Sequence, residues 1–82
     1  MNVDRELLAA VGRRIKVARQ NAGMHPQGLA DLAHVTLQTV YRWEGGRVDM
    51  GIAGLALVAR LLGVSAARLL GEDPGRPPEP GP

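Results

Sequence analysis

The N-terminal part of the chain has the hydrophobic pattern of a long amphipathic helix. Asp4 is a suitable N-cap for it, and Gly23 in the segment "NAG" can adopt the left-handed conformation that ends helices. The pattern predicts a helix that runs from about residue 4 to about residue 21. Its apolar positions recur at three- and four-residue steps and share one face: Leu8, Val11, Ile15 and Ala18.

Four shorter helices are predicted downstream, each bounded by residues that favour helix ends. They cover about residues 26–33, 37–44, 50–62 and 66–70. The residues suited to their starts are Pro26, Thr36, Asp49 and Ser65. The glycines that would end three of them are Gly45 with Gly46, Gly63 and Gly71.

This order of elements predicts an all-α fold with five helices and no strands. The second and third helices are short and are joined by a tight turn, so they must cross steeply, as helix-turn-helix units do. We expect one domain over residues 1–71. Residues 72–82, "EDPGRPPEPGP", contain five Pro and no large apolar side chain, so we expect a disordered tail there.

The third predicted helix has an outer face that neither a core nor an ordinary charged surface explains. Val40 and Trp43 fall on its inner face, with Val35 just before it. The outer face then carries side chains that suit contacts with another molecule: Leu37, Gln38, Tyr41 and Arg42.

Composition and charge narrow the function. Residues 1–70 carry a net charge of +4 and residues 71–82 a net charge of −2, and nine of the ten cations are Arg, which suits phosphate and base edges. The chain has no Cys, no apolar run long enough for a membrane helix and no signal-peptide pattern, so we expect a cytoplasmic protein. The two histidines lie nine residues apart on different elements, and we expect no metal, no cofactor and no enzymatic activity.

Five short motifs in order resemble the Xre/Cro type of helix-turn-helix domain, the type found in phage repressors. They are "VGRRIKVAR", Gly23, Leu29 with Ala30, "VTLQTVYRWEGG" and "LALVARLLGVS". The resemblance covers about residues 8–70. It implies a five-helix, lambda-repressor-like domain whose third helix enters the DNA major groove while the second lies across the DNA backbone.

The resemblance also implies roles for individual residues. Candidates for base contacts are Leu37, Gln38 and Arg42. Candidates for contacts with the DNA backbone are Thr36, Tyr41, Arg47, Arg19 and Gln27. By their charge alone, Arg13, Arg14 and Lys16 are further phosphate candidates, and a solvated surface explains them equally well. In families of this type the Arg near the end of the first helix pairs with the Glu at the end of the third, which here implies a structural pair of Arg19 and Glu44.

The start of the second helix and the turn after it depart from the family pattern. His25 and Pro26 stand where relatives have a Ser or Asn cap followed by Gln, so the neighbouring Gln27 would have to supply the backbone contact of that Gln. His34 stands where Gly is usual, and it tolerates positive φ at some cost. Gly28 weakens the short second helix by up to about 1 kcal/mol relative to Ala.

The helix predicted at residues 50–62 is apolar on almost every side, so more than one of its faces must be covered. We expect the monomer core to take Ile52, Leu55, Val58, Ala59 and Leu62. The remaining leucines predict a homodimer contact, unless the last helix and the tail cover them: Leu57, Leu61, Leu69 and Leu70.

The sequence thus favours a small sequence-specific transcriptional regulator, of repressor type, that binds a palindromic operator in double-stranded DNA as a homodimer. The alternative is a protein-interaction module of the same fold, such as an antitoxin or a regulator-docking protein, whose DNA binding is weak or lost. Gln38, Arg42, Glu44 and Arg47 favour the regulator. Leu37 and the absent Gln at the start of the second helix favour the interaction module.

Overall fold

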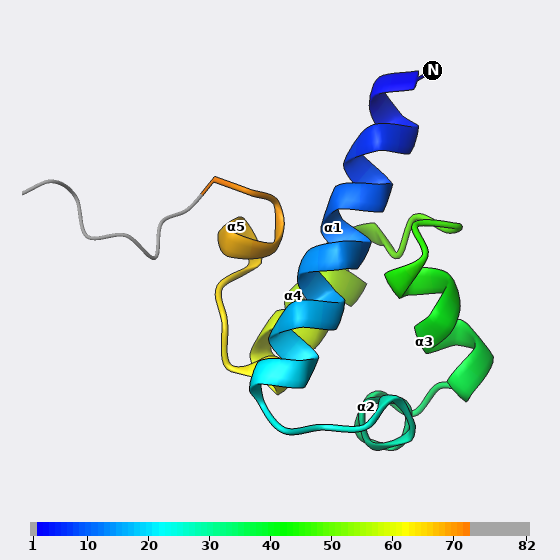
Figure 1. The fold of residues 1–82 in the computed structure, drawn as a ribbon, viewed down its shortest axis with the longest axis vertical. Helices are drawn as coiled ribbons and strands as arrows, with labels where there is room; N and C mark the ends of the chain where they lie inside the picture. Colours follow the sequence, from blue (N-terminus) through cyan, green and yellow to red (C-terminus); the bar gives the residue numbers. More distant parts are fainter. Residues whose placement is uncertain (1, 73–82) are drawn as a thin grey trace, which may run out of the picture.

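The computed structural model describes residues 2–72, and it describes side chains from residue 4 onward. This part of the chain forms five α-helices and contains no strand, which confirms the predicted fold class. Figure 1 shows α1 as a long rod between α5 on one side and α3 on the other, with α4 behind it and α2 near its C-terminal end. The helices are α1 (Asn2–Asn21), α2 (Pro26–Ala33), α3 (Leu37–Glu44), α4 (Gly51–Leu62) and α5 (Ala66–Leu69).

The N-terminal end of α1 differs from the prediction. The helix already begins at Asn2, so Asp4 is an exposed residue of the first turn and not an N-cap. A carboxylate in the first turn still interacts favourably with the helix dipole. The C-terminal end is as expected, because Gly23 adopts a φ of +70° just after the helix.

A three-residue turn joins α2 to α3. His34 ends α2 in the left-handed conformation, with φ 60° and ψ 43°, and it is the only non-glycine residue with positive φ in the described part of the chain. Val35 N–H then donates to Ala30 O at 3.0 Å, which satisfies one of the last carbonyls of α2. Thr36 caps α3 as predicted, since its Oγ1 accepts a hydrogen bond from Thr39 N–H at 3.1 Å.

The last two helices also differ slightly from their predicted bounds. Met50, in helical conformation, occupies the N-cap position of α4, while Asp49 Oδ1 accepts from Gly51 N–H at 2.9 Å. Asp49 therefore still satisfies a free donor at this helix end. Ser65 caps α5 as predicted, and the helix ends at Leu69, one residue earlier than expected.

All five helices contribute to one hydrophobic core. α1 packs against α3, α4 and α5, while α2 packs against α3 and α4. The expectation that Ile52 belongs to the core was wrong. Its side chain is 87% exposed, because no described element covers the first turn of α4 at this position. The core consists of Val11, Ile15, Leu29, Ala30, Val40, Leu55, Val58, Ala59, Leu62 and Leu69.

Two further expectations concern the chain outside this core. No helix within residues 2–72 has the length and apolar character that a membrane span requires. The tail expected at residues 72–82 lies, except for Glu72, outside the described residues.

Candidate nucleic-acid interface

One face of α3 is anchored in the protein and the opposite face is open. Val40 is completely buried, and Trp43 packs partly buried against the core. Gln38, Tyr41 and Arg42 are exposed, with Tyr41 54% accessible. Leu37 was expected to point outward and is half-buried. The helix therefore presents an amide, a phenol and a guanidinium to the outside from a well-anchored backbone.

The N-terminal end of this helix is ordered by two threonines. Besides the capping bond to Thr39 N–H, the hydroxyls of Thr36 and Thr39 lie 2.9 Å apart and share a hydrogen bond. Thr36 remains exposed. This side chain thus fixes the start of α3 and remains accessible at the surface.

The C-terminal end of α3 is held by a buried ion pair with α1. Arg19 Nε donates to Glu44 Oε2 at 2.6 Å, and Nη2 donates to Oε1 at 3.2 Å, so the pair is bidentate. Both side chains are only 7% exposed. A third bond runs from Nη1 to Met24 O at 2.8 Å and ties the loop before α2 to the same guanidinium.

This environment affects both the pKa of Arg19 and its availability for contacts with another molecule. Hydrogen bonding to Glu44 raises the pKa of the Arg19 guanidinium above its ordinary value, although burial acts in the opposite direction. The expected direct contact between Arg19 and a DNA phosphate needs correction, because all three nitrogens are already engaged and the residue is buried. Arg19 instead holds the C-terminal end of α3 and the loop before α2 against α1.

Two glycines bring α1 and the end of α3 into backbone contact, a feature to which sequence reasoning assigned no role. A Cβ on Gly12 would lie 2.5 Å from both Trp43 O and Glu44 O, and a Cβ on Gly46 would lie 2.7 Å from Ala9 Cα. No larger residue fits either place without a shift of backbone. The sequence did contain one sign of this close contact. Gly12 lies inside a predicted helix, where glycine is destabilising relative to Ala unless close packing requires it.

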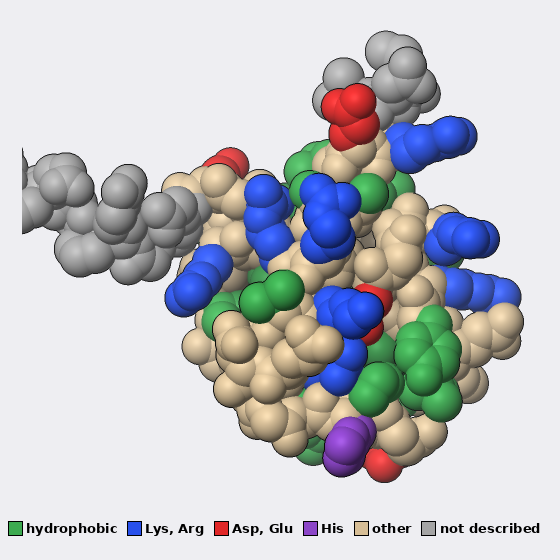
Figure 2. Space-filling view, viewed as in Figure 1, with side chains coloured by type: hydrophobic (Ala, Val, Ile, Leu, Met, Phe, Trp, Pro, Cys, Tyr) green, Lys and Arg blue, Asp and Glu red, His purple; other side chains and the backbone are tan. Residues whose placement is uncertain are grey.

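The other candidates for contacts with the DNA backbone differ in their exposure and in the hydrogen bonds that they already make within the protein. Arg47 is exposed in the loop after α3, beyond the turn formed by Gly45 and Gly46. Gln27 is exposed in the first turn of α2, and its Nε2 donates to Asp31 Oδ1 at 2.8 Å. Arg14 is directed elsewhere, because its Nη1 donates to Leu69 O at 3.3 Å. Figure 2 shows Lys and Arg side chains spread over the α1 face and over the side on which α3 lies.

The leucines expected at a dimer contact do not form one set. The expectation that Leu69 lies at a dimer contact was wrong. Leu69 is 1% exposed and belongs to the monomer core, so it has no surface to offer a second copy. Leu57 is 40% exposed, while Leu61 and Leu70 are partly buried against the core.

Within the described residues, no group of three or more His, Cys, Asp or Glu side chains is placed to hold a metal ion. His25 and His34 are both exposed, one at each end of α2. Their positions are those of helix-end residues.

Comparisons with known proteins place this arrangement in a family. A family model described as "Helix-turn-helix domain" matches residues 10–70, and no curated protein matches the chain. Two crystal structures of the clp gene regulator ClgR from Corynebacterium glutamicum are similar at 30% sequence identity. One superposes with a TM-score of 0.77 over 80% of this chain and 85% of that chain. The other gives 0.76 over 80% and 70%. The chain belongs to the helix-turn-helix domain family of DNA-binding transcriptional regulators.

Proposed function

We propose that this protein is a sequence-specific regulator that inserts α3 into the major groove of double-stranded DNA and represses transcription by occupying its operator. The observation that carries the proposal is the outer face of α3. Its exposed polar side chains project from a helix whose inner face is buried and whose C-terminal end is fixed by the pair of Arg19 and Glu44. The major groove admits one α-helix and presents a distinct donor and acceptor pattern for each base pair.

Three side chains of α3 suit base contacts. The Gln38 amide can bond to the N6 and N7 atoms of adenine, and the Arg42 guanidinium can bond to O6 and N7 of guanine or reach a phosphate. Leu37, at the first position of the helix, can meet a thymine methyl with the part of its side chain that remains exposed.

Around these side chains, groups suited to phosphate contacts come from three elements. Thr36 and Tyr41 belong to the start and the outer face of α3, Arg47 follows the helix, and Gln27 lies on α2. Such contacts fix the register of the protein on the duplex and carry no sequence information themselves. The net charge of +4 over residues 1–70 favours the approach to DNA.

Two copies would bind a two-fold operator. Leu57 is 40% exposed on the outer side of α4, and Leu61, one turn further along this side, is partly buried. A dimer formed through this side of α4 would match a palindrome whose half-sites lie about 34–36 Å apart, one helical turn of DNA. ClgR is described as a regulator of clp genes, which supports a gene-regulatory role for this chain.

Selection of bound sequences from a random duplex DNA library, at about 0.15 M salt, tests the proposal. The expected result is an enriched palindrome with two half-sites one turn apart. Retention without any enriched sequence, abolished by modest added salt, would contradict it.

A second candidate function rests on the exposed apolar side chains of α4. The exposed Ile52 and Leu57 side chains also suit a different protein partner, in which case the fold would serve protein docking and DNA binding would be weak. The selection experiment separates the two, because a docking module would enrich no DNA sequence.

A further inference from the structure

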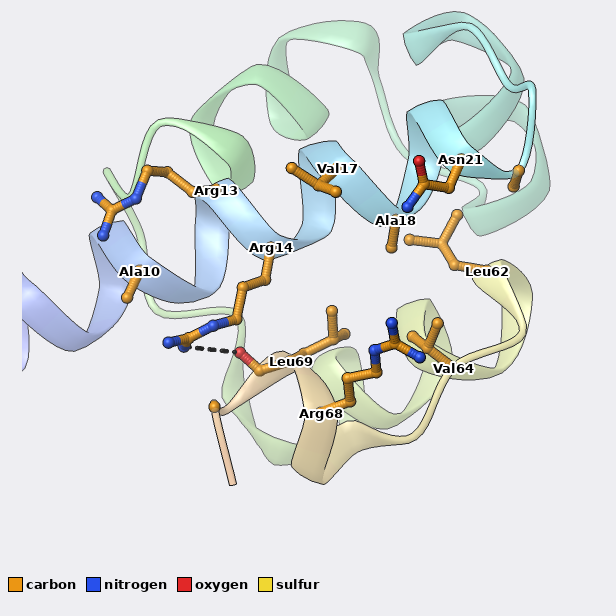
Figure 3. Close-up of a pocket in the computed structure, with 12 residues that line it drawn as sticks. Ala10, Arg13, Arg14, Val17, Ala18, Asn21, Leu62, Val64, Arg68 and Leu69 are labelled. Atoms are coloured by element: carbon orange, nitrogen blue, oxygen red, sulfur yellow. Dashed lines mark hydrogen bonds between the residues drawn. The ribbon is translucent and has the colours of Figure 1, made fainter. Parts of the chain in front are cut away.

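A groove with a volume of about 750 Å³ separates α1 from the C-terminal end of α4 and from α5 (Figure 3). This volume falls in the range of about 300–1,000 Å³ that is typical of small-molecule sites. No residue of α2 or α3 lines the groove, so it is separate from the proposed DNA interface. Its lining includes the apolar residues Val17, Ala18, Leu62, Val64 and Leu69.

Arg14 crosses the groove from α1 to α5. Its Nη1 donates to Leu69 O at 3.3 Å, and only this one of its five N–H donors bonds to a described residue. Gly71 lies directly behind the guanidinium: a Cβ there would be 2.7 Å from both Cζ and Nη2 of Arg14. The missing side chain at Gly71 therefore leaves the space in which the Arg14 head group is held.

Arg68 lines the other end of the groove, on the far side of Leu69 from Arg14 (Figure 3). It extends from α5 into the gap toward α1 (Figure 3), and its side chain makes no hydrogen bond or ion pair with any residue in the described range 4–72. None of the described residues that line the groove is acidic. Three arginines line this groove, Arg13, Arg14 and Arg68, and none of the described lining residues carries a carboxylate, so the groove is electrostatically complementary to an anion.

We propose that this groove binds a small amphipathic organic anion, with its anionic group held by Arg68 and its apolar body on the floor of the groove. Guanidinium groups bind carboxylate, sulfonate and phosphate oxygens with charge-assisted and often bidentate hydrogen bonds. Burial of a hydrocarbon or aromatic body against the apolar floor removes apolar surface from water and so favours binding. The site lies outside the α3 surface, so the proposal stands or falls independently of the DNA-binding role.

The test uses the fluorescent dye anilinonaphthalene sulfonate as the probe, titrated into the full chain. Wild type should bind one dye saturably, and Arg68→Gln should weaken binding by about tenfold or more, as expected for a lost charged hydrogen bond. Arg68 is exposed, so the variant keeps its fold. Arg60→Gln, which removes an exposed arginine from α4 outside the groove, should bind the dye as wild type does.

Competition identifies the chemistry of the ligand. Decanoate should displace the dye, whereas decanol, which lacks the charge, and acetate, which lacks the apolar body, should not do so at the same concentration. Backbone amide shifts on addition of decanoate should be concentrated at Val17, Val64, Arg68 and Gly71.

Several results would overturn the proposal. They are absence of saturable dye binding to wild type, equal loss in Arg68→Gln and Arg60→Gln, or displacement by decanol as effective as displacement by decanoate. A loss of DNA affinity in Arg68→Gln with unchanged dye affinity would assign this arginine to phosphate contacts instead.

Discussion

Arg19 at the end of α1 and Glu44 at the end of α3 form a bidentate ion pair that is almost completely removed from solvent, with Nε and Oε2 2.6 Å apart. A carboxylate at the C-terminal end of a helix is opposed by the helix dipole, so Glu44 depends on this cation. The same guanidinium holds Met24 O in the loop before α2. One side chain thus connects α1 with both parts of the helix-turn-helix unit.

Removing the charge of Glu44 should destabilise the whole domain. Glu44→Gln leaves the Arg19 charge buried without its partner, and loss of one member of a buried pair costs about 3–5 kcal/mol in the free energy of unfolding. Urea denaturation followed by circular dichroism measures the change. Glu6→Gln, at an exposed position of α1, should change stability by less than about 0.5 kcal/mol. Equal stability of the two variants would show that the pair contributes no more than a surface contact.

Gly12→Ala should disturb α3 although Gly12 does not belong to it. The added methyl would lie 2.5 Å from the carbonyl oxygens of Trp43 and Glu44, so α1 and α3 must move apart. Overpacking of this kind costs about 1–3 kcal/mol. Thermal unfolding gives the stability, and Trp43 fluorescence follows the end of α3.

Gly28→Ala is the matched control for Gly12→Ala. Its Cβ would meet only Met24 Cγ, at 3.1 Å, and this flexible side chain can give way. The gain in helix propensity, up to about 1 kcal/mol, should offset that contact. The proposed role of Gly12 would be wrong if both variants behaved alike.

Arg47→Gln should weaken DNA binding equally for all sequences. Each phosphate contact that is lost reduces the slope of log affinity against log salt concentration by about one unit. Affinities measured over a series of salt concentrations give this slope. Arg68→Gln, in the groove between α1 and α5, should leave the slope unchanged. A change of base preference in Arg47→Gln would instead mean that this side chain contacts a base.

Leu57→Lys should convert the proposed dimer into a monomer. Leu57 is 40% exposed on the outer side of α4, so a lysine there is tolerated in the monomer but would be buried in the proposed contact. Sedimentation at tens of micromolar measures the mass. Leu32→Lys, at an exposed position of α2, should remain dimeric. A wild-type protein that sediments as a monomer would contradict the dimer proposal directly.

Local signals in the sequence were sufficient to predict the helices. Thr36 and Ser65 cap their helices through their own side chains, and Gly63 and Gly71 take the positive φ values expected at or just after the helix ends. These features depend on neighbours only a few residues away, which is why α2 and α3 have the predicted bounds.

Long-range packing was harder to predict. Helical periodicity places Ile52 in line with the buried side of α4 but cannot show that nothing in residues 4–72 covers the first turn. Similarly, Leu69 belongs to the core because α5 turns back onto α1, an arrangement that depends on the whole fold. The close contact at Gly12 also joins segments that are distant in sequence. Within the candidate interface, the exposure of Gln38 and Arg42 could be predicted, since it follows from one helix alone.

The most direct test of the central claim, that the outer face of α3 recognises DNA bases, is the base preference of Gln38→Ala. Its affinity should be measured on the selected operator and on variants with each base pair changed in turn. We expect preference to be lost at one position of each half-site, at a cost of about 1–3 kcal/mol there, with the other positions unchanged. Gln20→Ala, which removes an exposed amide from α1, should retain the wild-type pattern. A uniform loss of affinity across all sequences in Gln38→Ala would contradict base recognition by this residue.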